Sequence, residues 1–431
     1  MSYSPKTSLV DLPNEILQKI ASLLPTDKDV TNFALVCKDI SDTVLPSEST
    51  IWRSRFGDLY DIPPGRSSNE LKTEYKARAI VLVQNIDFKR GEGAQQRLWL
   101  EVVHTMLLES LTLPLENYTS KTYDQLSERL KKLSFLRRPV SGYGLYKPQE
   151  PSELFCAVQL CLTAMVLHPA MSFCCLRTDY DIGTVYACGD EVKIPLIQSD
   201  APDLTSLLHM RNFWQRHLGN HCECTFFESF AKLPDHLRPS VRVFSDGEFS
   251  LGTSWLGYYS CLHPFPNSME QLHFRQTCAD LDTHWDQVEI MSLELELLPD
   301  DEKIWPTEFD AILPRLGESK NRAYFQGVQQ TYGGTTPARN GVVGFTEPIV
   351  VHYGGFPGWI RICFAIRDEV GQPAQAGSSA EQGQWKPWAL ERSAWLHGYE
   401  AVILPGGAVM LGRWVDMKDT TGRGPFIFWD V

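Results

Sequence analysis

Apolar residues recur at helical spacing through the first 56 residues of the chain. One stretch carries them at Leu12, Ile16, Leu17, Ile20, Leu23 and Leu24, and the next at Val30, Phe33, Ala34, Cys37, Ile40 and Val44. Pro13 suits the first turn of a helix, where its missing N–H is not needed. A break rich in Pro and Ser then precedes Trp52 and Phe56, one helical turn apart. The pattern predicts three short helices over residues 8–57.

The 3.6-residue apolar period continues through the middle of the chain. It is clearest over residues 95–111, 123–138, 152–167 and 203–218. Residues 139–151 contain Gly, Pro and Ser and predict a loop, whereas residues 178–196 fit a short hairpin. We therefore expect a mainly helical region over residues 69–238.

The pattern changes near residue 239, where short apolar runs alternate with glycine turns. Strands are predicted at residues 241–244, 349–352, 359–366, 399–404 and 409–414. Turn signals such as Gly354-Gly355 and Pro405-Gly406-Gly407 separate them. Residues 239–431 thus predict an antiparallel β-barrel or sandwich, which makes the whole chain an α+β multidomain protein.

Length, charge and cysteine content narrow the class of protein. The 431 residues allow two or three domains, and the net charge of −13 disfavours nucleic acid or an anionic membrane as a partner. The polar N-terminus shows no secretion signal, and no apolar run reaches the length of a membrane span. Eleven cysteines in a chain without a signal peptide indicate a reduced intracellular compartment, cytoplasmic and/or nuclear.

The first region is too small to bury all of its apolar surface within itself. Its residues resemble the F-box family through Leu12-Pro13, Val36-Cys37-Lys38 and Trp52, in the family's order and near its spacing. The resemblance implies a three-helix element that binds a Skp-type adaptor and, through it, a cullin. It carries adaptor contact to Leu12, Pro13, Ile16, Leu17, Ile20, Val36, Cys37 and Trp52. The family's aromatic residue after the cysteine is replaced by Ile40.

The rest of the chain is more loosely similar to the C-terminal half of fungal F-box proteins. The motifs include Arg211-Asn212-Phe213-Trp214, Trp255-Leu256-Gly257-Tyr258-Tyr259 and Gly424-Pro425-Phe426-Ile427-Phe428-Trp429. This resemblance implies a helical linker (69–238) followed by a β-rich module (239–431) that recruits a target protein for ubiquitination. A receptor of this kind is a non-catalytic subunit of an SCF-type ubiquitin ligase.

Tryptophans concentrate in the β-rich region and leave two interpretations open. They could contact a substrate or ligand, with Trp255, Trp359, Trp385, Trp388 and Trp414 as candidates, or they could fill a barrel core. The alternative function is a lipocalin-like β-barrel that binds or converts a small molecule, with a regulatory F-box. A filled barrel would count against it.

No other pattern predicts a cofactor or a metal site. His217, His221, Cys222 and Cys224 lie close together, but their spacing is not that of a zinc site, and a helix end followed by a loop is favoured. The chain has no P-loop, dinucleotide glycine fingerprint, G-x-S-x-G elbow or H-E-x-x-H motif. We therefore expect neither catalytic residues nor cofactors.

Overall fold

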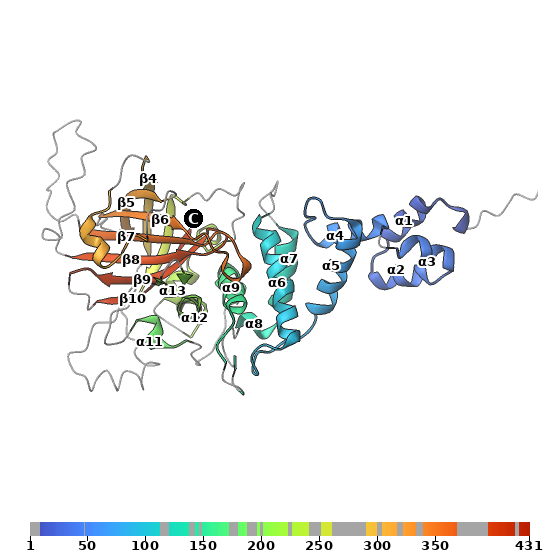
Figure 1. Ribbon diagram of the computed structural model, residues 1–431, viewed down its shortest axis with the longest axis horizontal. Coiled ribbons are helices and arrows are strands. Elements are labelled where there is room, and N and C mark those ends of the chain that lie inside the picture. Colours follow the sequence, from blue (N-terminus) through green and yellow to red (C-terminus); the bar gives the residue numbers. More distant parts are fainter. Residues whose placement is uncertain are drawn as a thin grey trace, which may run out of the picture. The chain divides into compact units, whose positions relative to one another are not determined.

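Figure 1 shows the protein as a computed structural model. The structure describes residues 9–46, 48–112, 120–137, 143–144, 146, 149–171, 180–187, 196–198, 201–222, 226–240, 251–260, 290–299, 304–316, 322–332, 339–368, 395–418 and 422–431. The chain forms two compact units, one of Met1–Ile86 with Ala94–Lys132 and the other of Asp87–Gly93 with Leu133–Val431. We call them the N-terminal unit and the barrel unit.

The N-terminal unit is helical. Its elements are η1 (Leu9–Asp11), α1 (Asn14–Ser22), α2 (Asp27–Ala34), α3 (Lys38–Val44), α4 (Thr50–Leu59), α5 (Ser68–Val81), α6 (Ala94–Thr112) and α7 (Lys121–Leu130). Hydroxyl caps start several of these helices: the Thr26 side chain accepts a hydrogen bond from the Asp29 amide, and Ser67 with Glu70 forms a capping box at α5. The caps satisfy amides that no helical carbonyl can reach.

The helix predicted over residues 30–44 is in fact two helices. Helix α2 ends at Ala34, and Cys37 has an extended backbone (φ −158°, ψ 167°) before α3 begins. The apolar positions remain buried on both sides of this break, so the periodicity alone did not reveal it. The break exposes Leu35 and Val36 to solvent.

The barrel unit begins with helices. They are α8 (Ser134–Arg137), α9 (Glu153–Cys161), α10 (Thr163–Val166), η2 (Pro169–Met171), α11 (Ile182–Val185), α12 (Leu204–Gly219), α13 (Phe227–Ala231) and η3 (Asp235–Leu237), with a short pair of strands β1 (Ile197–Gln198) and β2 (Ala201–Pro202). The helices predicted at 152–167 and 203–218 are confirmed as α9 with α10 and as α12. Within the predicted hairpin at 178–196, residues 182–185 are helical instead, because Asp181 caps α11 by accepting from the Thr184 amide.

The C-terminal strands close into an antiparallel barrel. They are β3 (Ser254–Tyr259), β4 (Met291–Leu297), β5 (Ala323–Thr331), β6 (Asn340–Pro348), β7 (Ile360–Asp368), β8 (Leu396–Ile403), β9 (Val409–Asp416) and β10 (Arg423–Asp430), with the 3-10 turns η4 (Thr307–Ala311) and η5 (Tyr353–Gly355) between them. Each strand pairs with the next along the chain, and β10 pairs with β3. The prediction of a β-barrel or sandwich is thereby resolved in favour of a barrel.

One of the predicted strands is wrong in most of its length, and another is not tested. Residues 350–352 lie in the loop between β6 and β7, because the pairing ends where the Ile349 amide donates to the Trp359 carbonyl. Val350 is 88% exposed there. Residues 241–244 lie outside the described residues.

Side chains alternate between the inside and the outside of the barrel, and along β7 both faces are buried. Along β7, Ile360, Ile362, Phe364 and Ile366 belong to the interior cluster. Cys363 and Ala365 point the other way, into a second cluster with Trp305 and Phe309 of the segment between β4 and β5. Because both faces are apolar, the period-two signal of a half-exposed strand is weak here.

Helices α12 and α13 pack on the outside of the barrel. The Trp214 ring of α12 lies 6.4 Å from Tyr258 of β3, and Phe230 of α13 lies 5.5 Å from Trp429 of β10. The Trp429 indole N–H donates to the Leu237 carbonyl oxygen (2.8 Å). Helices α12 and α13 therefore belong to the same compact unit as the barrel.

A buried ion cluster lies on the outer face of the barrel. It joins the Arg361 guanidinium to the carboxylates of Glu347 and Glu400. The Arg361 side chain, 1% exposed, donates to Glu400 and to Glu347 at 2.8 Å each. Glu400 also accepts from the Leu196 amide (2.7 Å), which attaches the segment before β1 to the barrel. Burial raises the pKa of Glu400, while Arg361 opposes that rise.

We predict that Glu400→Ala destabilises the barrel unit by about 3–5 kcal/mol, because it leaves Arg361 buried without that carboxylate. Urea unfolding followed by tryptophan fluorescence measures the loss. Glu296→Ala on the exposed side of β4 is the control and should change stability by less than about 0.5 kcal/mol. Equal effects of the two substitutions would contradict the assigned role of the cluster.

Candidate partner-docking surface

The core of residues 9–57 is built from a few small and branched side chains. Those that pack together are Ala21, Val30, Ala34, Ile40, Val44 and Ile51. Helix α1 turns Leu17 and Ala21 inward, and the Gln18 carboxamide accepts from the Thr50 hydroxyl of α4 (2.8 Å). One side of α1 is thus committed to the unit's own core.

The other side of α1 is apolar and open to solvent. Ile16 is 47% exposed and Leu23 is 71% exposed, and half-buried Ile20 falls between them at helical spacing. At the break between α2 and α3, Leu35 and Val36 are 74% and 67% exposed. Large apolar side chains that are exposed together in this way mark a surface that another protein covers.

The predicted adaptor contacts divide into two groups. Leu12, Ile20 and Cys37 are half-buried and Pro13, Ile16 and Val36 are exposed, so a partner can reach them. Leu17 and Trp52 are buried, at 2% and 8% exposure. Their side chains hold the unit together and do not present a surface in this conformation.

Trp52 joins α4 to its surroundings. Its indole N–H donates to the Pro46 carbonyl oxygen (3.0 Å), and its ring lies 6.4 Å from that of Tyr75 in α5. The Lys72 ammonium sits 5.1 Å from the Trp52 ring centroid, at a distance that permits a cation–π interaction. The tryptophan in the motif therefore has a structural role as the link from α4 to α5.

Leu23 and Leu35 are exposed apolar residues that the motif did not assign to the adaptor. Leu23 follows the last residue of α1, and Leu35 follows the last residue of α2. The sequence shows their apolar character but not their exposure. Only the position of the helix ends identifies them as exposed.

Three of the candidate tryptophans in the β-rich region are buried. Trp255 and Trp414 belong to the interior cluster at 0% and 3% exposure, and Trp359, also 0% exposed, donates its indole N–H to the Tyr353 carbonyl oxygen (3.1 Å). The interior cluster has eighteen buried apolar residues, including the stacked rings of Phe364 and Tyr399, 4.7 Å apart. This packing supports the filled-core interpretation of these three residues.

Trp385 and Trp388 lie outside the described residues, so their predicted contact with a substrate stays a prediction.

The suspected metal ligands do not form a site among the residues the structure describes. No group of three or more His, Cys, Asp or Glu there could hold a metal ion. His217 is buried against the Phe213 ring (4.3 Å), and its Nε2 lies 3.2 Å from the Tyr180 hydroxyl, while Cys224 lies outside the described residues. Within the described part of the chain, no helix is long and apolar enough to cross a membrane.

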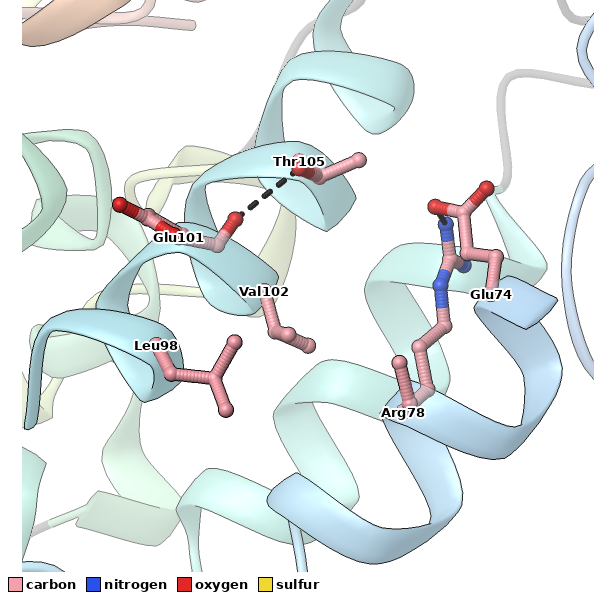
Figure 2. A pocket seen from close by; sticks show the side chains of 7 residues that line it. Glu74, Arg78, Leu98, Glu101, Val102 and Thr105 are labelled. Carbon is pink, nitrogen blue, oxygen red and sulfur yellow. Dashed lines mark hydrogen bonds and ion pairs between the residues drawn. The ribbon is translucent and has the colours of Figure 1, made fainter. Parts of the chain in front are cut away.

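A hollow of about 250 Å³ lies between α5 and α6 (Figure 2). Its lining is Glu74, Ala77, Arg78, Leu98, Glu101, Val102 and Thr105. Arg78 and Glu74 are paired with each other, and the Thr105 hydroxyl donates to the Glu101 backbone carbonyl (2.9 Å). The lining contains no nucleophile beside a general base, so the hollow does not have the arrangement of a catalytic site.

We predict opposite effects for two neighbouring substitutions in α1. Ile16→Asp should change the free energy of unfolding by less than about 0.5 kcal/mol, because its side chain is in water. Leu17→Asp should cost several kcal/mol, as an order of magnitude, because it buries a charge in an apolar core. Thermal unfolding by circular dichroism measures both, and a severe effect of Ile16→Asp would show that the residue is not free.

Comparison with known proteins adds one match. The F-box-like family matches residues 9–57, the region that contains η1 and α1 to α4. No curated protein and no solved structure matches the chain. The similarity of the remaining residues to fungal F-box proteins is therefore without support beyond the motifs. An F-box-like domain in general implies binding to a Skp-type adaptor and a substrate-receptor role in SCF ubiquitin ligases, and residues 9–57 of this chain are an F-box-like domain.

Proposed function

We propose that this chain is the substrate receptor of an SCF-type cullin-RING ubiquitin ligase. The F-box-like domain binds the Skp-type adaptor and, through it, the cullin, and the barrel unit recruits a protein target. The observation that carries the proposal is the exposed apolar surface of the matched domain, above all Ile16, Leu23, Leu35 and Val36.

Adaptor binding follows from the energetics of that surface. Burying a Leu, Ile or Val side chain contributes about 1.5–3 kcal/mol relative to leaving it exposed. Four such side chains provide ample driving force for association, even after the cost of immobilising the partners. The exposed face of α1 suits helix-on-helix packing, a common mode of recognition for amphipathic helices.

The receptor would act without catalytic residues of its own. F-box proteins are typically non-catalytic subunits, and holding a target lysine near the charged conjugating enzyme raises its effective concentration. F-box proteins are also generally intracellular, so we place this chain in the cytoplasm and/or the nucleus. The target itself remains to be identified by capture with the intact chain.

The alternative, a lipocalin-like binder of small molecules, has less support. A ligand cavity lined by Trp255, Trp359 and Trp414 would need open space beside them, but Trp255 and Trp414 pack within a cluster of buried apolar side chains. The Trp359 indole N–H donates a hydrogen bond to the loop before β7. We therefore favour a barrel that presents its outer surface and loops to a protein.

We predict that the intact chain binds a purified Skp-type adaptor and that Ile16→Asp with Val36→Asp abolishes or severely weakens binding. Each charge placed in the apolar interface should cost about 2–3 kcal/mol, or roughly a 30- to 160-fold rise in Kd. Biolayer interferometry with immobilised adaptor measures this.

Val350→Asp is the control, since Val350 is also apolar and exposed but lies in the barrel unit. It should leave the Kd unchanged. Absence of binding by a folded intact chain would overturn the proposal, as would full binding by the double variant.

A further inference from the structure

Arg78 of α5 contacts two carboxylates through a single nitrogen. Its Nη2 lies 2.6 Å from Glu74 Oε1 on the same helix and 2.5 Å from Glu109 Oε2 on α6. Figure 2 shows the Arg78–Glu74 pair at the edge of the hollow between the two helices. The Arg78 side chain is 1% exposed and that of Glu109 is 8% exposed.

The F-box-like domain forms one wall of this cluster. The Arg78 guanidinium packs 4.8 Å from the ring centroid of Phe56 in α4 and 4.6 Å from that of Tyr60, the residue after α4. The other charges nearby are Arg66, 3.9 Å from Glu74, and Arg129 of α7 and Asp27 of α2, which act on the Tyr60 phenol. Among the described residues, Arg78 is the cation that forms an ion pair with Glu109.

Inside the cluster two carboxylates share the one buried guanidinium, because the second cation, Arg66, is 38% exposed and lies 3.9 Å from Glu74. Like charges this close cannot both ionise easily, and one of them retains a proton. Desolvation, with a smaller contribution from Glu74, raises the pKa of Glu109 to about 7 against the attraction of Arg78. A proton on Glu109 can also be donated to Glu74, which turns repulsion into a hydrogen bond.

We propose that Glu109 and Glu74 hold one shared proton beside Arg78, and that losing this proton weakens the attachment of α5 to α6. The device is independent of the proposed ligase function. Because Arg78 packs against Phe56 of α4, pH would change the stability of the helices α5 and α6 on which the F-box-like domain packs. The neighbouring hollow reaches Glu74 and Arg78, so solvent has a route for the proton.

The direction of the pH effect follows from linkage. Glu109 binds its proton more tightly in the folded state than in the unfolded state, so this group favours folding at low pH. That contribution is complete below the ordinary pKa of a glutamate and is lost as pH rises through about 7. The N-terminal unit should therefore become locally less stable between about pH 5 and pH 7.5.

We expect two signatures in the full-length chain. Infrared titration should show a protonated carboxyl band that disappears near neutral pH and is absent from Glu109→Gln. Hydrogen exchange should show that the protection factors of α5 and α6 fall by about tenfold from pH 5.5 to 7.5 in the wild type, and much less in Glu109→Gln, whose amide stays neutral.

Glu101→Gln is the control, because Glu101 lies on the same helix and lines the hollow but is exposed and pairs with Arg97 at 3.3 Å. It should behave like the wild type. Equal pH dependence in the wild type and Glu109→Gln would overturn the proposal.

Glu74→Gln keeps the test decisive if Glu109→Gln fails to fold. It leaves Glu109 facing Arg78 without a second carboxylate, so the infrared band should disappear at lower pH than in the wild type. An unchanged midpoint would show that no proton is shared between the two groups.

Discussion

The pairing of β10 with β3 is the constraint on which the barrel unit depends. Five register pairs, from Phe426 with Tyr259 to Asp430 with Trp255, join the last strand of the chain to the first strand of the barrel. Closure leaves no open edge to pair with other chains. It also creates an interior in which Phe426 and Phe428 meet Phe364 across the barrel, so the C-terminal residues are part of the central core.

Closure makes the outer face equally important. Many of the barrel's outward side chains are apolar, and α12, α13 and the segment around Trp305 cover them. Arg361, Glu347 and Glu400 lie on this covered face, where each charge needs a partner. Helices α12 and α13 and the barrel are consequently packed together within one unit.

The F-box-like domain differs from the barrel because part of its apolar surface stays exposed. It has too few residues to cover its own apolar side chains, and the surplus appears at Ile16, Leu23, Leu35 and Val36. Its inner face instead contacts α5. Trp52 of the domain and Arg78 of α5 lie at this contact, and both side chains are nearly fully buried. A domain with one face in use inside its own unit and one left open is suited to carrying a partner.

The sequence by itself determined the F-box-like domain, the long helices and the presence of β structure after residue 239, because these depend on local periodicity, caps and glycine turns. It did not distinguish a barrel from a sandwich, and β5 and β6 were not anticipated. Strand β6 is buried on both faces and therefore lacks a clean alternation. Tertiary structure alone decided that Trp52 and Leu17 are internal while Leu23 and Leu35 are exposed. It also decided that Glu74, Arg78 and Glu109 meet, because residues 31 apart in the chain come together only when two helices pack.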